Sequence, residues 1–275
     1  MKILNKEILL DSGGVRIGML EVLSPDIALK AKPGQFIVLM ASEKGERVPL
    51  TVVEKNPSKG TIRLIFQEAG LTTRVLGAMK AGESLYSLVG PLGHPTEIKK
   101  YGKAIIVGGG VGIAEIYPVA KAMKEAGNHV TTVLGARSKD LLILEKELKN
   151  TSDEFYIATD DGSYGRKGFT TDILEELLSK GKYDLVYSVG PIPMMKRTSM
   201  VTKKFNAKTI VSLNAIMVDA TGMCGCCRVT VGGKTYFSCV DGPEFDASLV
   251  DWEELIKRNR IYDDKEKHIC KLNII

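Results

Sequence analysis

The sequence predicts an antiparallel β-barrel, then a doubly wound parallel α/β sheet, then a small C-terminal segment built around cysteines. Three observations predict this order. Short strands separated by turn residues fill the N-terminal part. From residue 104 apolar strands alternate with glycine-rich loops and helices. Four of the five cysteines lie between residues 224 and 239. We therefore expect three domains, over residues 1–98, 99–215 and 216–275.

Composition limits the classes of function. The chain has 275 residues, of which 44% are hydrophobic and 26% charged, as in ordinary globular proteins. No apolar run approaches the roughly 18 residues of a membrane span, and the N-terminus lacks an export signal, so we expect a cytoplasmic protein without membrane contact. The net charge of +5 comes from lysines scattered among glutamates. This pattern does not favour nucleic-acid binding, although it suits attraction of an acidic electron carrier.

The expected barrel has five strands, punctuated by Pro-Gly and Ser-Lys-Gly turns. They are Val15 to Val22, Phe36 to Ala41, Leu50 to Glu54, Thr61 to Gln67 and Ser84 to Val89. After the fourth strand, Gly70-Leu71-Thr72-Thr73 predicts a helix start, where glycine allows close approach and free N–H groups suit a phosphate. Taken singly, Thr72 could be a simple N-cap and Arg47, before the third strand, a surface charge.

The expected α/β part contains seven elements. They are Ala104 to Val107, Ile116 to Ala126, Val130 to Leu134, Leu142 to Leu148, Phe155 to Ala158, Thr171 to Leu178 and Leu185 to Val189. The loop Gly108-Gly109-Gly110-Val111-Gly112-Ile113 joins the first strand to a helix, as pyrophosphate-binding loops do. It does not match the strict G-x-G-x-x-G fingerprint, and the second strand ends without the usual ribose-binding acid. The loops at 159–165 and 190–194 follow later strands and are expected at the same ligand-binding edge.

The cysteines predict an iron–sulfur site. Cys224 and Cys227 form a C-x2-C pair, and a predicted hairpin with a Gly232-Gly233 turn would return Cys239 to them. Plant-type [2Fe-2S] loops place a further cysteine five residues before the pair, where this chain has Asp219. We expect Asp219, Cys224, Cys227 and Cys239 to be the metal ligands.

Other interpretations of the cysteines remain open. A carboxylate ligand is a harder donor than a thiolate and should alter the cluster potential. Cys226 should point away from its neighbour Cys227 and is interpreted as a spare thiol. A zinc knuckle is the alternative for these residues, but the spacing fits it less well. A disulfide is less favoured still, because no export signal accompanies the cysteines.

Together these motifs resemble the ferredoxin-NADP reductase superfamily, and within it the electron-transfer subunit of dihydroorotate dehydrogenase. Asp219, in place of the first cysteine, is the main departure from that subunit. In this respect the chain resembles the small subunits of NADH-dependent reduced ferredoxin:NADP oxidoreductases, also described as sulfide dehydrogenase subunits. Arg47 stands four residues before its hydroxyl, where the superfamily has three. The resemblance implies FAD contacts at Arg47, Val48, Pro49, Leu50, Thr51, Phe66, Gln67, Gly70, Thr72 and Thr73. It implies a nicotinamide site at Gly108, Gly109, Gly110, Val111, Gly112, Ile113, Asp161, Gly162 and Met194.

The resemblance implies an electron-transfer subunit that exchanges a hydride between NAD(H) or NADP(H) and FAD and passes single electrons through a [2Fe-2S] cluster. We expect a larger partner subunit with its own flavin or iron–sulfur centres, and ferredoxin as a further candidate partner. Hydride transfer needs little acid or base help, so no catalytic side chain is expected. The alternatives are a dihydroorotate dehydrogenase subunit, a stand-alone flavin reductase with structural zinc, and a redox-sensing regulator. The choice between NAD and NADP stays open, because Arg137, Ser138 and Lys139 fit either a 2′-phosphate site or a charged turn.

Overall fold

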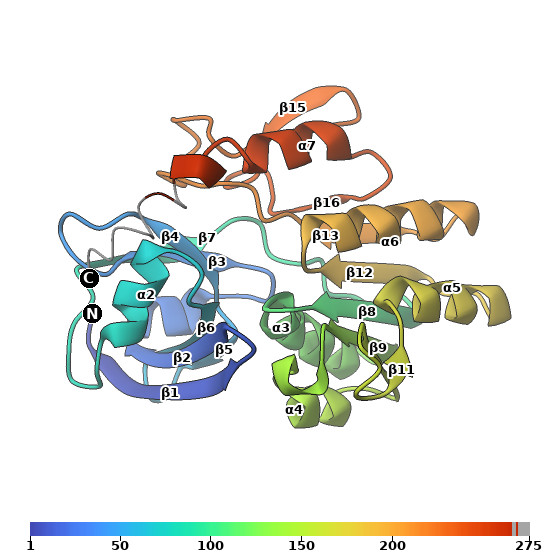
Figure 1. Ribbon diagram of the computed structural model, residues 1–275, viewed down its shortest axis with the longest axis horizontal. Helices are drawn as coiled ribbons and strands as arrows, with labels where there is room; N and C mark the ends of the chain where they lie inside the picture. The colour runs from blue at the N-terminus through green and yellow to red at the C-terminus, as the bar shows by residue number, and fades with distance from the viewer. Residues whose placement is uncertain (266–267, 269–275) are drawn as a thin grey trace.

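The computed structural model describes residues 1–265 and 268, arranged as three packed parts (Figure 1). The N-terminal barrel, in blue and cyan, lies beside the α/β sheet, in green and yellow. The C-terminal segment, in orange and red, lies against both. The predicted fold class is confirmed, with antiparallel sheets first and a parallel sheet second.

The barrel consists of two antiparallel sheets. The first has the order β1 (Ile3–Ser12), β2 (Val15–Leu23), β6 (Thr61–Gln67), β5 (Glu54–Asn56), and the second β4 (Val48–Thr51), β3 (Phe36–Met40), β7 (Ser87–Leu92). Helices α1 (Pro25–Lys30) and α2 (Leu71–Ala78) complete it. Strand β1 was not predicted, because most of its side chains are exposed or half-buried and it has no apolar alternation. The predicted strand over 50–54 divides into the end of β4 and the start of β5.

The second part is a seven-stranded sheet of order β11-β10-β9-β8-β12-β13-β16, parallel except for β16. Its strands are β8 (Lys103–Gly109), β9 (His129–Ala136), β10 (Glu154–Thr159), β11 (Arg166–Lys167), β12 (Leu185–Val189), β13 (Thr209–Ser212) and β16 (Glu244–Asp246). The chain winds outward from β8 in one direction and from β12 in the other. The carboxyl ends of these two neighbours therefore form the topological switch point where open α/β sheets bind ligands.

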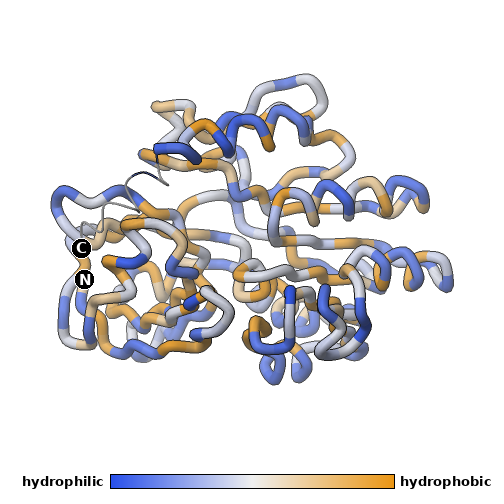
Figure 2. Tube along the Cα trace, viewed as in Figure 1, coloured by the Kyte–Doolittle hydropathy of each residue, from blue (hydrophilic) through white to orange (hydrophobic). Residues whose placement is uncertain are grey.

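Helices cover both faces of this sheet. They are α3 (Gly112–Glu125), η1 (Lys139–Leu141), α4 (Glu145–Asn150), α5 (Thr170–Lys180) and α6 (Ile192–Lys204). Side chains of α3 share an apolar core with barrel residues such as Ile17 and Met19, whereas α5 and α6 pack in a separate core. Figure 2 shows the central strands as mainly hydrophobic and the outer helices with hydrophilic stretches. The helix predicted over 142–148 is displaced toward residue 150, and α6 and β13 were not predicted.

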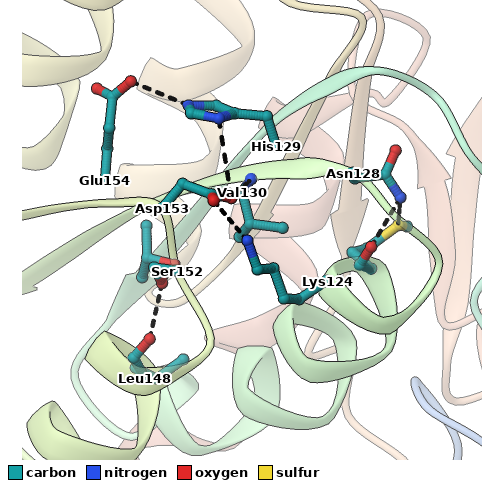
Figure 3. A network of polar contacts seen from close by, with 10 residues as sticks. Lys124, Asn128, His129, Val130, Leu148, Ser152, Asp153 and Glu154 are labelled. Atoms are coloured by element: carbon teal, nitrogen blue, oxygen red, sulfur yellow. Dashed lines mark hydrogen bonds and ion pairs between the residues drawn. The ribbon is translucent and has the colours of Figure 1, made fainter.

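Polar side chains join the amino-terminal edge of the sheet (Figure 3). His129, which begins β9, contacts Glu154 at 3.0 Å and Asp153 at 3.8 Å, and Lys124 also pairs with Asp153. The Asn128 side chain donates to the carbonyl of Met123. This edge lies opposite the switch point, so His129 has a structural role, in agreement with its place outside the motifs.

The C-terminal segment contains the predicted hairpin and short helix. Strands β14 (Arg228–Val231) and β15 (Lys234–Phe237) pair across Gly232 and Gly233, whose φ angles of 58° and 75° suit the turn expected for a two-residue hairpin loop. Helix α7 (Trp252–Asn259) begins after Asp251, whose carboxylate accepts a hydrogen bond of 3.0 Å from the Glu254 N–H. The fifth cysteine, Cys270, lies outside the described residues.

One buried carboxyl group joins all three parts of the molecule. Glu244 of β16 accepts hydrogen bonds from the hydroxyls of Thr96, which follows the barrel, and Tyr187 of β12, the latter at 2.8 Å. Gly34 of the barrel lies so close that a Cβ there would be 2.2 Å from the Thr96 hydroxyl oxygen. Burial raises the pKa of Glu244, although its two hydrogen bonds act in the opposite direction.

We expect Glu244→Ala to lower the free energy of unfolding by about 1–3 kcal/mol, because the Tyr187 hydroxyl would lose its buried acceptor. Glu244→Gln keeps an acceptor and should cost less. Because the folded protein holds this proton more tightly than the unfolded chain, the wild-type free energy of unfolding should fall as pH rises above about 4.5. Urea titrations across this range test the prediction. An equal pH slope in Glu244→Gln and wild type would contradict it.

Candidate functional site

A cavity of about 600 Å³ lies between the barrel and the carboxyl edge of the parallel sheet. The barrel contributes Val15, Ile17 and Gln67 to its lining. The sheet contributes the glycine-rich loop after β8, the end of β9, and the loops that follow β10 and β12. The cavity therefore opens at the switch point between β8 and β12, where a nucleotide is expected.

The glycine-rich loop divides into a lining half and a buried half. Gly109, Gly110 and Val111 line the cavity, and Gly110 has a φ of +57° with nothing within 4 Å of a Cβ position. At Gly112 a Cβ would meet the Val189 carbonyl oxygen at 2.8 Å. Gly110 thus leaves room for a ligand, and Gly112 lets α3 pack against β12. Gly108 and Ile113 are also buried beneath the loop.

Of the other predicted nicotinamide residues, only one lines the cavity. Met194 lines the cavity, and its sulfur would lie 2.5 Å from a Cβ at Gly109. Asp161 and Gly162 do not line it. The Asp161 carboxylate instead accepts hydrogen bonds from the Ser163 N–H and hydroxyl, which lower its pKa. The acid that does line the cavity is Asp160.

Phe169 and Arg197 are among the lining residues that sequence reasoning missed. The Arg197 guanidinium lies 5.2 Å from the centre of the Phe169 ring and 3.4 Å from the Asp172 carboxylate. It gives the cavity a cationic wall, together with Arg137 at the end of β9. The only sequence signal for Arg197 is its position one helical turn after Met194, which places both side chains on one face of α6.

The predicted flavin strand has the exposure expected of a ligand surface. All four residues of β4, Val48 to Thr51, are half-buried, whereas the neighbouring β3 is buried except for Met40. Strand β4 is also an edge strand, so among the described residues no further strand covers its outer side. Arg47, immediately before it, is exposed. Phe66 does not share this surface, because its side chain is 1% exposed and packs in the barrel core against Gly18.

The predicted pyrophosphate residues lie at the start of α2. Gly70 is the N-cap, and its N–H and that of Ala69 both donate to the Thr73 hydroxyl at 3.0 Å. The Thr72 hydroxyl is therefore not a capping group. It donates a hydrogen bond of 3.0 Å to the Glu46 carboxylate. A bound phosphate would have to compete with this carboxylate for the Thr72 hydroxyl. The first turn of α2 carries no acidic side chain, and its leading N–H groups have no partner within the helix.

The cysteine loop brings its predicted ligands together in pairs. The Cys239 N–H donates to the Cys227 sulfur, and both cysteines are 2% exposed. Asp219 interacts with Cys224 at the other side of the loop. Within the described part of the chain, no three His, Cys, Asp or Glu side chains are close enough to hold a single metal ion. Two separated pairs fit the two irons of a [2Fe-2S] cluster better than one tetrahedral zinc.

Backbone conformation gives the loop its shape. Ala220, Gly222 and Gly225 all have φ between 60° and 82°, which winds the chain around the ligand side chains. The Asp219 carboxylate accepts the N–H groups of Thr221 at 2.9 Å and Cys224 at 3.0 Å. These bonds lower its pKa and keep it charged. Asp219 is thus oriented toward the cysteines, with lone pairs left for a metal.

The thiols have further partners. Burial, and then the contact with Cys227, raises the pKa of the Cys239 thiol to about 12, so iron binding must displace its proton. The Cys226 N–H and the Cys239 N–H donate to the sulfurs of Cys224 and Cys227, each at 3.5 Å. Such bonds to sulfur are among the determinants of cluster potential. Burial, and then the contact with Cys224, raises the pKa of the Cys226 thiol.

Comparisons with known proteins match both sites. Residues 106–200 match a family model described as the oxidoreductase NAD-binding domain. Residues 214–251 match the iron–sulfur cluster binding domain of dihydroorotate dehydrogenase B. The fold itself also occurs in a cytochrome P450 reductase from Amycolatopsis, with a TM-score of 0.63, 21% identity, and coverage of 74% of this chain and 65% of that one. The chain is an oxidoreductase of the ferredoxin-NADP reductase type.

More similar relatives narrow this class. A homolog of the dihydroorotate dehydrogenase B (NAD+) electron transfer subunit from Thermotoga maritima is 52% identical over 89% of this chain and 86% of its own. A probable subunit of that kind from Methanopyrus kandleri is 34% identical over 81% of this chain and 82% of its own. A chain in the solved structure of the NADH-dependent reduced ferredoxin-NADP oxidoreductase is 47% identical, with a TM-score of 0.91. The match covers 97% of this chain and 95% of that one. The chain belongs to the family of dihydroorotate dehydrogenase B electron transfer subunits and their homologs.

The family and the fold define the cofactors. The NAD-binding domain binds NAD(H), the C-terminal segment an iron–sulfur cluster, and the barrel of this flavoprotein fold FAD. The cluster-binding match supports the predicted iron–sulfur cluster over the alternative zinc knuckle. In residues 1–265 and 268, no helix has both the length and the apolar character that crossing a bilayer requires.

Proposed function

We propose that this chain is the electron-transfer subunit of a larger oxidoreductase of the ferredoxin:NADP transhydrogenation type. Bound FAD would exchange a hydride with NAD(H) and single electrons with a [2Fe-2S] cluster. The observation that carries the proposal is the paired arrangement of Asp219 with Cys224 and of Cys227 with Cys239 in a segment packed on the barrel. One apolar cluster contains both buried cysteines and Phe36 and Val38 of β3, the neighbour of the proposed flavin strand.

The chain's own residues have defined tasks in this proposal. Gly109, Gly110 and Val111 approach the nucleotide closely, and the cationic Arg197 suits its phosphates. The half-buried side chains of β4 support the flavin ring, and the N–H groups at the start of α2 bind its pyrophosphate. Gln67 and Met194 border the space where the two rings would meet. We further propose that the division into residues 1–98, 99–215 and 216–275 follows these three binding tasks.

The partner would dock over the cysteine loop. Val218, Met223 and Val240 are 46%, 88% and 39% exposed around this loop, an unusual concentration of apolar surface beside charged residues. A Cβ at Gly222 would lie 3.1 Å from Val240, so the loop and this side chain are adjacent. The relatives are named as electron transfer subunits, which implies a larger subunit. We propose that this subunit, with ferredoxin as a further partner, receives the electrons here.

The role of Asp219 has its own test. In Asp219→Cys we expect the cluster to be retained but its electron paramagnetic resonance signal and potential to shift, because a thiolate replaces a harder oxygen donor. Asp219→Asn keeps only one of the two acceptors for the Thr221 and Cys224 N–H groups, because its amide nitrogen cannot accept, and serves as the control for a loop without the carboxylate. Identical signals in wild type and Asp219→Cys would show that Asp219 only shapes the loop.

The names of the relatives also favour a second candidate, a dihydroorotate dehydrogenase subunit. Copurification of the native complex, followed by assay with dihydroorotate and with reduced ferredoxin plus NADP, distinguishes the two. Activity with ferredoxin and none with dihydroorotate supports the proposal. The opposite result favours the second candidate, and the same assay with NADH and NADPH settles the nucleotide preference.

A further inference from the structure

Helix α7 is fixed against the cysteine loop. Its Leu255 is 2% exposed and belongs to the apolar cluster that contains Cys227 and Cys239. At the carboxyl end of the helix, the Asn259 side chain donates a hydrogen bond of 2.9 Å to the Asn214 carbonyl, just before the cysteine segment. Side chains in the last turn of α7 therefore have a defined position relative to the proposed cluster ligands.

One of these side chains reaches the ligand loop itself. The Arg258 guanidinium donates a hydrogen bond of 3.0 Å from Nη2 to the carbonyl oxygen of Cys226. Cys226 stands between the proposed ligands Cys224 and Cys227, so a positive charge lies against the backbone that carries two of the four ligands. Arg258 is half-buried, and salt screens a partly buried charge less than an exposed one.

Folding alone does not account for this arginine. Among residues 1–265 and 268, its buried Nε has no hydrogen-bond partner and its guanidinium forms no ion pair. A buried donor of a charged group without a partner opposes folding, so its presence needs another explanation. Arg228 also lies beside the loop, with a guanidinium nitrogen 3.0 Å from a Cβ position at Gly225, but it is exposed. Solvent therefore screens the charge of Arg228 more strongly.

A charge beside an iron–sulfur cluster changes how readily the cluster accepts an electron. A [2Fe-2S] centre with four anionic ligands is already anionic when oxidised, and reduction adds one more negative charge. A neighbouring cation therefore stabilises the reduced form more than the oxidised form, which raises the reduction potential. The strength of this effect depends on how firmly the cation is positioned and how little water screens it.

We propose that Arg258 is a positioning residue that raises the reduction potential of the cluster. Its hydrogen bond to the Cys226 carbonyl keeps the guanidinium charge beside the ligand loop. The inference rests on the proposed function, because it concerns the potential at which electrons pass between the flavin and the cluster. It assigns this contribution to a helix that supplies no ligand.

Three variants separate the charge from the structure. Arg258→Gln keeps N–H donors and removes the charge, whereas Arg258→Lys keeps the charge. Arg260→Gln removes the same charge from an exposed position two residues later and is the matched control. The cluster potential would be measured by anaerobic redox titration of the flavin- and cluster-loaded protein, followed by electron paramagnetic resonance.

In Arg258→Gln the potential should fall by about 59 mV, which is a tenfold change in the one-electron equilibrium. Arg258→Lys and Arg260→Gln should keep the wild-type potential. Thermal unfolding of the cluster-free protein gives a readout that does not involve the cluster. Arg258→Gln should have the wild-type Tm there, because the buried Nε that it removes has no partner among the described residues.

Two results would overturn the inference alone. The first is a wild-type potential in Arg258→Gln, and the second is loss of the cluster from this variant, which would assign Arg258 to the stability of the loop. A wild-type protein that binds no flavin or cluster would overturn the proposed function together with the inference.

Discussion

Cys227→Ser is expected to leave the protein without its iron–sulfur cluster and without electron delivery to a partner. Cys227 is 2% exposed, contacts the Cys239 thiol, and accepts the Cys239 N–H at its sulfur. A serine hydroxyl is a far weaker ligand for iron than a thiolate, so cluster affinity should fall by at least about 100-fold. Reduction of the flavin by NADH does not involve this residue and should persist.

Cys226→Ser is the matched control, since it changes the adjacent thiol without removing a proposed ligand. It keeps the Cys226 N–H that donates to Cys224 and the carbonyl that accepts the Arg258 guanidinium at 3.0 Å. Iron and acid-labile sulfide analysis, together with single-turnover transfer to a one-electron acceptor, would measure both variants. Full cluster content in Cys227→Ser with loss in Cys226→Ser would reverse the ligand assignment.

The second large effect is expected at the glycine-rich loop. Alanine at Gly112 would place its Cβ 2.8 Å from the Val189 carbonyl oxygen and 2.9 Å from the backbone of Gly190. Both contacts are with main-chain atoms at the end of a central strand, which cannot move aside. The glycine-rich loop and α3 must therefore move. Overpacking of this kind costs about 1–3 kcal/mol of stability. Displacement of the loop by about 1 Å should lower kcat/KM for NADH by about 100-fold.

Flavin and cluster content should be unchanged in Gly112→Ala, because neither binding surface includes this residue. Gly181→Ala is the control. Gly181 follows α5 with an extended backbone, φ −169°, and nothing lies within 4 Å of its Cβ position. Steady-state kinetics and thermal unfolding of both variants test the prediction. Normal kcat/KM and stability in Gly112→Ala would mean that the loop does not need a glycine here.

Much of the architecture was predictable because its signals are local. Alternating apolar patterns located most barrel strands, and glycine loops after buried strands located the α/β units. Strand β1 was missed since its exposed side chains give no alternation. Helix α6 was missed because Gly190-Pro191, interpreted as a loop, is also the start of a helix.

The candidate site was predictable to the same extent. Cysteine spacing and the glycine-rich loop are continuous in sequence, so their residues could be named in advance. The contact of Arg197 with Phe169 depends on how distant segments pack. No spacing rule joins them.

The most direct test of the account is the cofactor content of the anaerobically purified chain. Iron, acid-labile sulfide, zinc and flavin would be measured per polypeptide, with an electron paramagnetic resonance spectrum after reduction. The account predicts about two iron and about two sulfide for each flavin, with the signal of a reduced [2Fe-2S] centre. One zinc per chain, without iron or sulfide, would contradict it.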